Sequence, residues 1–294
     1  MTWFWLAILS AFLSASAAII QKRILFDVRP LDFSLIVSGL IAVLSTPLLA
    51  LTDFGYFDMS SLMYLFLKSV LNAFAFLCIM TALKNLQLSR ALPVLAATPM
   101  FIALLAFIFL GESLSAYEVT GMFLIVTGTY ILELKKEEGF LHPLTVFKNS
   151  GYHRIILLAL LLMSVSSVMD KFILVKFKLP PVLFVVVQNY FFLLIFLITY
   201  LLTGKNSFGS VFKSVKSRQL FFLILITALL TIGYRLAQIG SVKLAPVGVV
   251  ISLKRLSVLF AVLIGTKIFR EESYFKKIAA TFLIVAGAMM IYED

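Results

Sequence analysis

The chain has 294 residues, of which 62% are hydrophobic and only 13% are charged, and its formal net charge is +11. Soluble domains are about 45–50% apolar and about 25% charged, so this composition excludes an ordinary soluble protein and indicates an integral membrane protein. The positive charges lie in short stretches between apolar runs rather than on one soluble face, which argues against a nucleic-acid partner.

Ten apolar runs are long enough to cross a lipid bilayer, which takes about 20 residues at about 1.5 Å per residue. Because the runs are continuously apolar rather than alternating, they predict helices and exclude a barrel of strands. They cover residues 3–21, 32–51, 61–83, 91–110, 117–134, 155–175, 182–202, 219–240, 244–265 and 274–291. The sequence therefore predicts an all-α integral membrane protein with ten transmembrane helices.

Three prolines mark positions where this helical pattern is expected to change. Pro93 and Pro99 lie inside the fourth run, where each removes a backbone donor and favours a kink or a break. Pro246 stands near the beginning of the ninth run, where proline is a signal for the start of a helix.

The chain repeats itself, which is the strongest indication of its organisation. The tetrapeptide FLIV occurs at 123–126 and again at 282–285, and the same shift along the chain superposes Glu112 on Glu271. Each half holds five predicted helices, and this odd number makes the second copy enter the membrane from the opposite side. Inverted repeats are typical of secondary transporters, whose substrate site lies near the midplane between the two copies.

The predicted units are a first repeat at 1–134, a connecting loop at 135–154 and a second repeat at 155–294. Glycines at matching places in the fifth and tenth helices permit close packing of helices, either within the chain or in a homodimer.

Three short motifs link these features to a known family: LGES at 110–113, its echo FREES at 269–273, and LPVLAATPMF at 92–101. Together with the two five-helix copies, they resemble the drug/metabolite transporter superfamily, specifically its EamA type, over nearly the whole chain. The resemblance implies a multi-pass transporter of the cell membrane that acts on a small molecule.

Four cations, Lys68, Arg235, Lys254 and Arg255, fall within predicted helices, whereas Asp170 is the one acid expected at a similar depth. A cation at the centre of a membrane helix costs about 2.5–3.5 kcal/mol on insertion scales, so such residues normally face a cavity or a partner. A bound anion would relieve the cost of burying so much positive charge. We therefore expect an anionic substrate.

Lys254 and Arg255 are adjacent in the ninth predicted helix, where their side chains point about 100° apart. Arginine offers a planar fork for phosphate or carboxylate and lysine a point charge, so the pair can bind an anion from two flanks. The pair resembles the phosphate-binding lysine and arginine of the triose-phosphate translocator branch of the superfamily.

Uncharged polar residues accompany the cations at helical spacing. Thr231 precedes Arg235 by one turn with Tyr234 beside it, Asn72 shares a face with Lys68, and Gln188 lies within the seventh helix. Polar stripes in membrane helices often join helices together. We nevertheless expect these residues to donate hydrogen bonds to the substrate.

The sequence thus predicts a secondary transporter of a small anionic metabolite, phosphorylated or carboxylated, that works by alternating access. An exporter of amino acids or drugs with an apolar, aromatic-lined cavity is the alternative, in which the buried Lys and Arg side chains would be structural. His142 and His153 have no neighbouring acid or cysteine arranged as a metal site, and no phosphate-cradling glycine loop is present. An enzymatic activity, a metal and a cofactor are therefore not expected.

Overall fold

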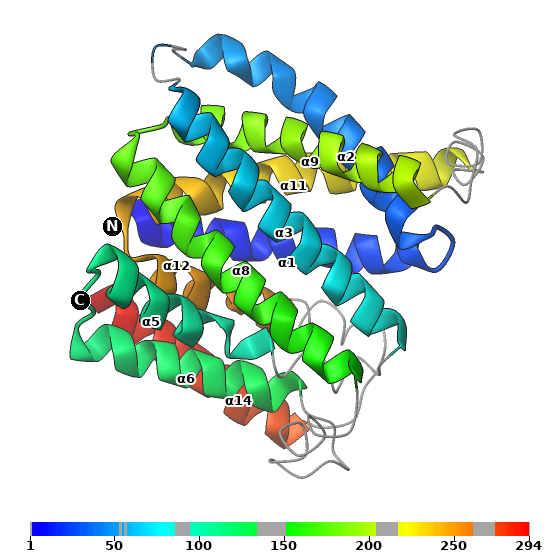
Figure 1. The fold of residues 1–294 in the computed structure, drawn as a ribbon. Coiled ribbons are helices and arrows are strands. Elements are labelled where there is room, and N and C mark those ends of the chain that lie inside the picture. Colours follow the sequence, from blue (N-terminus) through cyan, green and yellow to red (C-terminus); the bar gives the residue numbers. More distant parts are fainter. Residues whose placement is uncertain are drawn as a thin grey trace.

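A computed structural model describes residues 2–52, 55, 58–85, 95–133, 151–203, 217–260 and 274–293. The described part is helical throughout and contains ten α-helices and one 3₁₀ helix (Figure 1). These are α1 (Thr2–Leu25), α2 (Pro30–Ser45), η1 (Thr46–Leu51), α3 (Met59–Asn85), α5 (Thr98–Leu110), α6 (Ala116–Glu133), α8 (Gly151–Lys176), α9 (Pro181–Thr203), α11 (Arg218–Leu244), α12 (Val247–Lys254) and α14 (Tyr274–Glu293). The predicted all-α class and the ten helices are confirmed.

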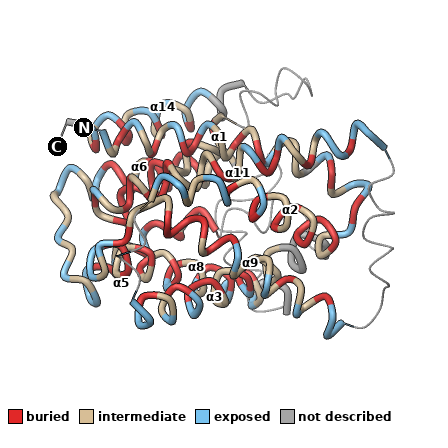
Figure 2. Tube along the Cα trace, turned by 90° about the horizontal axis from the view of Figure 1, so that it is seen from above, coloured by how far each residue is buried: buried red, intermediate tan, exposed pale blue. Residues whose placement is uncertain are grey.

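The outer surface of the helices matches a membrane environment. Six segments of the described chain are long and apolar enough to cross a bilayer, and α5, α6 and α14 add shorter apolar stretches. Large hydrophobic side chains such as Phe109 (72% exposed) and Phe282 (71% exposed) point outward. Buried residues lie along the helix faces that meet inside the bundle (Figure 2). Lipid rather than water can cover such a surface without cost.

Proline marks two places where the α-helices differ from the predicted runs, and Pro246 precedes α12 as the predicted start signal of that helix. The second run continues beyond Ser45 as the 3₁₀ helix η1, because Pro47 lacks the backbone N–H that an α-helix needs. The ninth helix begins at Val247 rather than at residue 244, because α11 extends to Leu244. Between them Ala245 is extended (φ −136°, ψ 165°), the conformation that a following proline imposes.

The helices of the two halves pack on one another mainly in matching pairs: each of the main contacts remains a contact when the two halves are interchanged. The first helix of one half packs on the third helix of the other, as α1 on α11 and as α8 on α3. Three further pairs join a helix to its own counterpart, as α2 with α9, α5 with α12 and α6 with α14. The other main contacts between the halves also come in matching pairs, α1 with α12 and α8 with α5, and α2 with α11 and α9 with α3. The two termini lie at the same end of the bundle (Figure 1). This arrangement is the predicted inverted repeat of two five-helix units.

Glycines make the closest of these contacts, between α6 and α14. A Cβ atom built on Gly121 would lie 2.6 Å from the carbonyl oxygen of Gly287, and one built on Gly287 would lie 2.5 Å from that of Gly121. A Cβ on Gly128 would meet the carbonyl oxygen of Ala280 at 2.8 Å. The glycines predicted to allow close packing are therefore used within the chain.

Replacing Gly121 with alanine should lower the stability of the protein by on the order of 1–3 kcal/mol, because the added methyl group collides with backbone that cannot rotate away. Thermal unfolding in detergent measures the effect. Gly39→Ala is the matched control, since a Cβ there meets only Leu193 Cδ1 at an ordinary 3.8 Å. Equal melting temperatures for the two variants would contradict this account of the α6–α14 crossing.

The fourth and ninth helices are interrupted at corresponding places. The chain is helical at Leu95 and Ala96, turns at Ala97 and restarts as α5, with Pro99 in its first turn. In the other half, α12 is followed by a turn at Arg255 and a further helical stretch over 256–260. Pro99 thus marks a break, as predicted, whereas Pro93 lies outside the described residues. Both interruptions adjoin the centre of the bundle.

Candidate functional site

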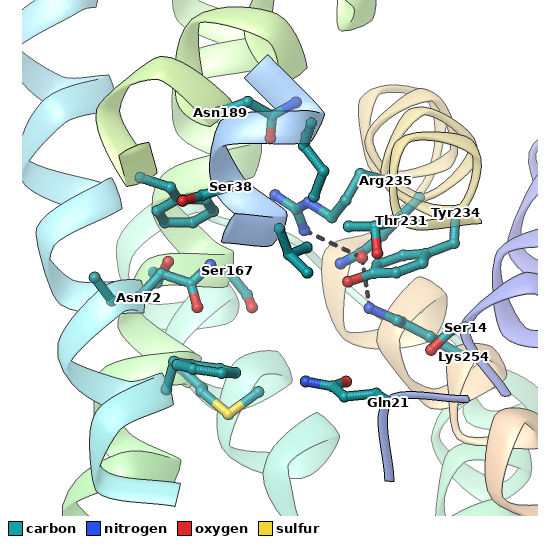
Figure 3. A pocket seen from close by; sticks show the side chains of 18 of the residues that line it. Ser14, Gln21, Ser38, Asn72, Ser167, Asn189, Thr231, Tyr234, Arg235 and Lys254 are labelled. Atoms are coloured by element: carbon teal, nitrogen blue, oxygen red, sulfur yellow. Dashed lines mark hydrogen bonds between the residues drawn. The ribbon is translucent and has the colours of Figure 1, made fainter. Parts of the chain in front are cut away.

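A cavity of about 400 Å³ lies between the two halves, within the size range of small-molecule sites. Side chains from α1, α2, α3, α5, α8, α9, α11 and α12 line it (Figure 3). Six of the residues predicted to bind substrate are among them: Asn72, Thr231, Tyr234, Arg235, Lys254 and Arg255. The other two, Lys68 and Gln188, are not part of this lining; they lie behind it and contact its residues.

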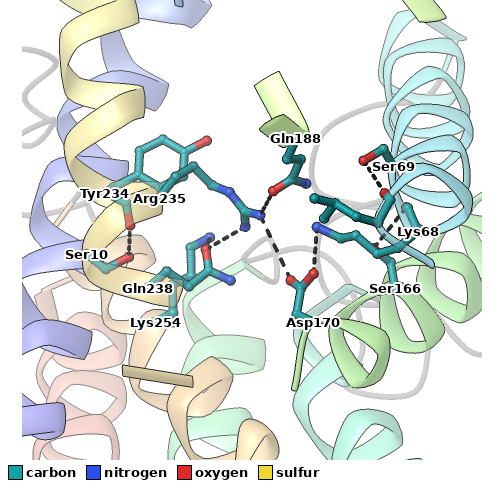
Figure 4. A network of polar contacts seen from close by, with 11 residues as sticks. Ser10, Lys68, Ser69, Ser166, Asp170, Gln188, Tyr234, Arg235, Gln238 and Lys254 are labelled. Carbon is teal, nitrogen blue, oxygen red and sulfur yellow. Dashed lines mark hydrogen bonds and ion pairs between the residues drawn. The ribbon is translucent and has the colours of Figure 1, made fainter. Parts of the chain in front are cut away.

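Lys254 and Arg235 share one uncharged acceptor at the wall of the cavity (Figure 4). Lys254 Nζ donates to Gln238 Oε1 at 2.6 Å, and Arg235 Nη1 donates to the same oxygen at 3.2 Å. Lys254 Nζ also lies 5.0 Å from the centre of the Tyr234 ring. Of these contacts, the amide oxygen and the aromatic ring hold Lys254 in position, and neither of them carries a negative charge.

Asp170 is the one acidic residue among the described residues that line the cavity, and it already has cationic neighbours. Its Oδ1 lies 2.6 Å from Lys68 Nζ and its Oδ2 lies 3.9 Å from Arg235 Nη2. Lys68 is fully buried and also stacks on Phe184, with 5.2 Å from Nζ to the ring centre. Lys68 therefore acts as the fixed counter-charge of Asp170.

Gln188 fixes the side chain of Arg235 from behind the wall. Its Oε1 accepts a hydrogen bond of 2.6 Å from Arg235 Nη2. Arg235 is thus held between Gln188 on α9 and Gln238 on its own helix, α11. Two amides and one shared carboxylate orient the guanidinium toward the cavity.

Arg255 connects the two interrupted helices. Its Nη2 donates to the carbonyl oxygen of Leu95 at 2.5 Å, just before the turn at Ala97. Gly248 permits the nearby contact of α12 with α5, because a Cβ there would lie 2.7 Å from Ala103 Cβ. The side chain of Arg255 lines the cavity at the place where the two halves meet.

Several residues of this site were not among those predicted to bind substrate. Gln238 follows Arg235 by three positions and continues the polar stripe of α11. Asn189 lines the cavity and is 6% exposed, and its Nδ2 has no hydrogen-bond partner within the described chain. Four phenylalanines also line the cavity. Nothing in the sequence distinguishes them from the other phenylalanines, of which the chain has 29 in all.

A second polar cluster joins α8 to the turn between α11 and α12. Lys171 Nζ donates to the carbonyl oxygens of Val242 and Ala245 at 2.9 and 2.8 Å and lies 3.6 Å from Glu112 Oε1. Glu112 Oε2 in turn accepts from the backbone N–H of Val247, the first residue of α12, at 3.0 Å. Glu112 therefore lies at the N-terminus of α12, where the helix dipole favours a carboxylate, and not at that of α6, the helix that follows it in the chain.

Glu112→Ala should destabilise the protein by about 1–2 kcal/mol, because it removes both the cap of α12 and the partner of Lys171. Glu112→Gln should cost less, since its amide oxygen still accepts from Val247. Melting temperatures of the two variants in detergent give the comparison. If the glutamine variant is as unstable as the alanine variant, the stabilisation comes from the negative charge of Glu112 and not from its hydrogen bond to Val247.

Comparison with known proteins agrees with this architecture. A model of the EamA-like transporter family matches residues 1–134 and 153–293. A solved crystal structure of a protein is similar in fold, with a TM-score of 0.74 over 98% of this chain and 95% of that chain, at 16% sequence identity. No curated protein matches. The match confirms the EamA-type resemblance, whereas the link of Lys254 and Arg255 to the triose-phosphate translocator branch stays a prediction.

Proposed function

Because the chain belongs to the EamA-like transporter family, and is therefore a multi-pass membrane protein that transports small molecules, we propose that its cargo is a small organic anion. In this proposal the protein lies in the cell membrane and moves a phosphorylated or carboxylated metabolite. The anion binds in the central cavity to Lys254, Arg235 and Arg255, and the two repeats expose that cavity to each side in turn.

The observation that carries the proposal is the balance of charge around the cavity. Three cations line it, whereas the one acid among the described lining residues, Asp170, lies 2.6 Å from Lys68. Lys254 is held by the oxygen of Gln238, which is uncharged and supplies no counter-charge for the lysine. Charge in a poorly solvated space favours a ligand of opposite sign, and charge-assisted hydrogen bonds to it are about twice as strong as neutral ones.

The alternative cargo, an amino acid or a drug, fits these contacts less well if it carries an ammonium group. The one acid that could pair with an ammonium group among the described lining residues is Asp170, which is engaged by Lys68 at 2.6 Å and approached by Arg235 at 3.9 Å. A substrate ammonium would have to displace a fully buried lysine. We therefore favour an anion without a compensating positive charge.

Thermal shift of the detergent-solubilised protein tests this proposal. A ligand that binds only the folded state raises its stability by about 2.7 kcal/mol at a hundred times its Kd. Inorganic phosphate, phosphate monoesters and small carboxylates should stabilise the protein, whereas zwitterionic amino acids and organic cations of similar size should not. Stabilisation by the amino acids or cations alone would refute the anionic substrate and favour the alternative.

A further inference from the structure

Charge and apolar surface occupy different walls of the central cavity. The aromatic side chains of the lining are, besides Tyr234, four phenylalanines: Phe33 on α2, Phe76 on α3, and Phe192 and Phe196 on α9. Among the described residues, these three helices contribute no charged side chain to the lining. Phe76 and Phe192 both pack on Phe196, at 5.8 and 6.2 Å between ring centres. Phe76, Phe192 and Phe196 therefore form a continuous surface of rings, here called the aromatic wall.

The cations come from other helices, although the guanidinium of Arg235 reaches α9, where Gln188 accepts a hydrogen bond from it at 2.6 Å. Arg235 lies on α11, Lys254 ends α12 and Arg255 follows it, and none of the phenylalanines that line the cavity belongs to these helices. In Figure 3 the labelled side chains of Arg235, Tyr234 and Lys254 lie across the cavity from Asn72, Ser38 and Ser167. A ligand that reaches both sides meets positive charge at one end and a largely apolar surface at the other.

The hydroxyl groups on the aromatic side are already engaged by their own helix. Ser38 Oγ donates to the carbonyl oxygen of Leu35 at 3.0 Å, and Ser34 Oγ donates to that of Pro30 at 2.7 Å. A hydroxyl that donates to its own backbone has no donor left for a ligand and can only accept a hydrogen bond from it. Asn72 and Asn189 remain as amides that could hold one or two polar atoms of a ligand.

We infer that the transported anion is amphipathic: one phosphate or carboxylate group attached to a compact apolar body, most favourably an aromatic ring, rather than a polyhydroxylated sugar phosphate. This inference rests on the proposed function. The anionic group lies against Lys254, Arg235 and Arg255, and the body lies against Phe76 and Phe192. The separation of the two walls gives the substrate a single orientation.

Three phosphate monoesters with different bodies and the same head group test the inference. Phenyl phosphate should bind more tightly than methyl phosphate by on the order of tenfold to a hundredfold, because the ring leaves water for an apolar wall. Glycerol 3-phosphate, with its two hydroxyls, should bind no better than methyl phosphate. Isothermal titration of the full-length protein in detergent gives the three affinities, and phenylacetate against acetate repeats the comparison for carboxylates.

Two variants of the aromatic wall make the assignment specific. Phe76→Ala and Phe192→Ala, on different helices, should each lower the ratio of the affinities for phenyl phosphate and methyl phosphate severalfold. Phe74→Ala is the matched control, since Phe74 lies on the same helix as Phe76 and is 56% exposed on the outer surface.

The outcomes separate this inference from the proposed function. Equal affinities for phenyl and methyl phosphate, or tighter binding of glycerol 3-phosphate, would overturn the amphipathic substrate while leaving an anion transporter. A preference for the phenyl group that both wall variants retain would also overturn it, since the ring would then bind elsewhere. If no phosphate and no carboxylate binds, the proposed function fails together with the inference.

Discussion

Lys254→Gln is expected to weaken the binding of small anions by on the order of tenfold to a hundredfold, the loss typical of a charge-assisted hydrogen bond in a poorly solvated site. Glutamine is close in length to lysine and can still donate to Gln238. The change therefore removes the charge but leaves an N–H donor on the side chain, whose present hydrogen bond to Gln238 is 2.6 Å long. Titration of the purified protein with phosphate monoesters, and uptake into proteoliposomes, measure the effect.

Lys254→Arg is the matched control for this experiment. It retains the positive charge and the contact with the Tyr234 ring, so it should keep most of the affinity for anions. Retention of full affinity in Lys254→Gln, with the variant folded and inserted, would show that the lysine only joins α12 to α11. The family assignment would then stand without the anionic substrate.

Asp170→Asn should destabilise the protein by about 3–5 kcal/mol, the cost of leaving a buried charge without its partner. Lys68 is fully buried and its Nζ lies 2.6 Å from the carboxylate, so it has no route to water once the charge of Asp170 is removed. A large fall in melting temperature and in the yield of folded protein is the expected measurement.

The double variant Lys68→Met, Asp170→Leu distinguishes a structural ion pair from a substrate contact. Removing both charges leaves apolar side chains of similar volume, a change that is often neutral or stabilising for buried pairs. We expect the double variant to recover most of the melting temperature that Asp170→Asn loses. If Asp170→Asn melts like the wild type, Lys68 must have another partner, and its assignment as the counter-charge of Asp170 is wrong.

The class and the topology of the protein could be predicted from local sequence. Whether about 20 consecutive residues can enter a bilayer depends on their own side chains and little on the rest of the chain, so composition alone indicated the membrane spans. The repeated FLIV segments then divided the helices into two sets of five. Helix boundaries were less certain, because Pro47 and Pro246 change the local backbone within runs that remain apolar.

The cations of the site were also visible from the sequence, since charge inside an apolar helix is costly and needs an explanation. Their separate roles were not visible. Lys68 and Lys254 look alike as lysines within predicted helices, yet one lies 2.6 Å from Asp170 and the other donates to the neutral Gln238. This difference depends on which helices pack together, and spacing along one helix carries no information about that.

By itself, then, the sequence determined a ten-helix membrane protein with an inverted repeat and an excess of buried positive charge. Only the tertiary structure decided which cations line the cavity, and that Phe76 and Phe192 face it while Phe74 and Phe109 point outward. The physical reason is that lipid and the interior of a helix bundle are equally apolar. A phenylalanine gains the same free energy in either place, so hydropathy cannot tell the wall of a binding site from the outer surface.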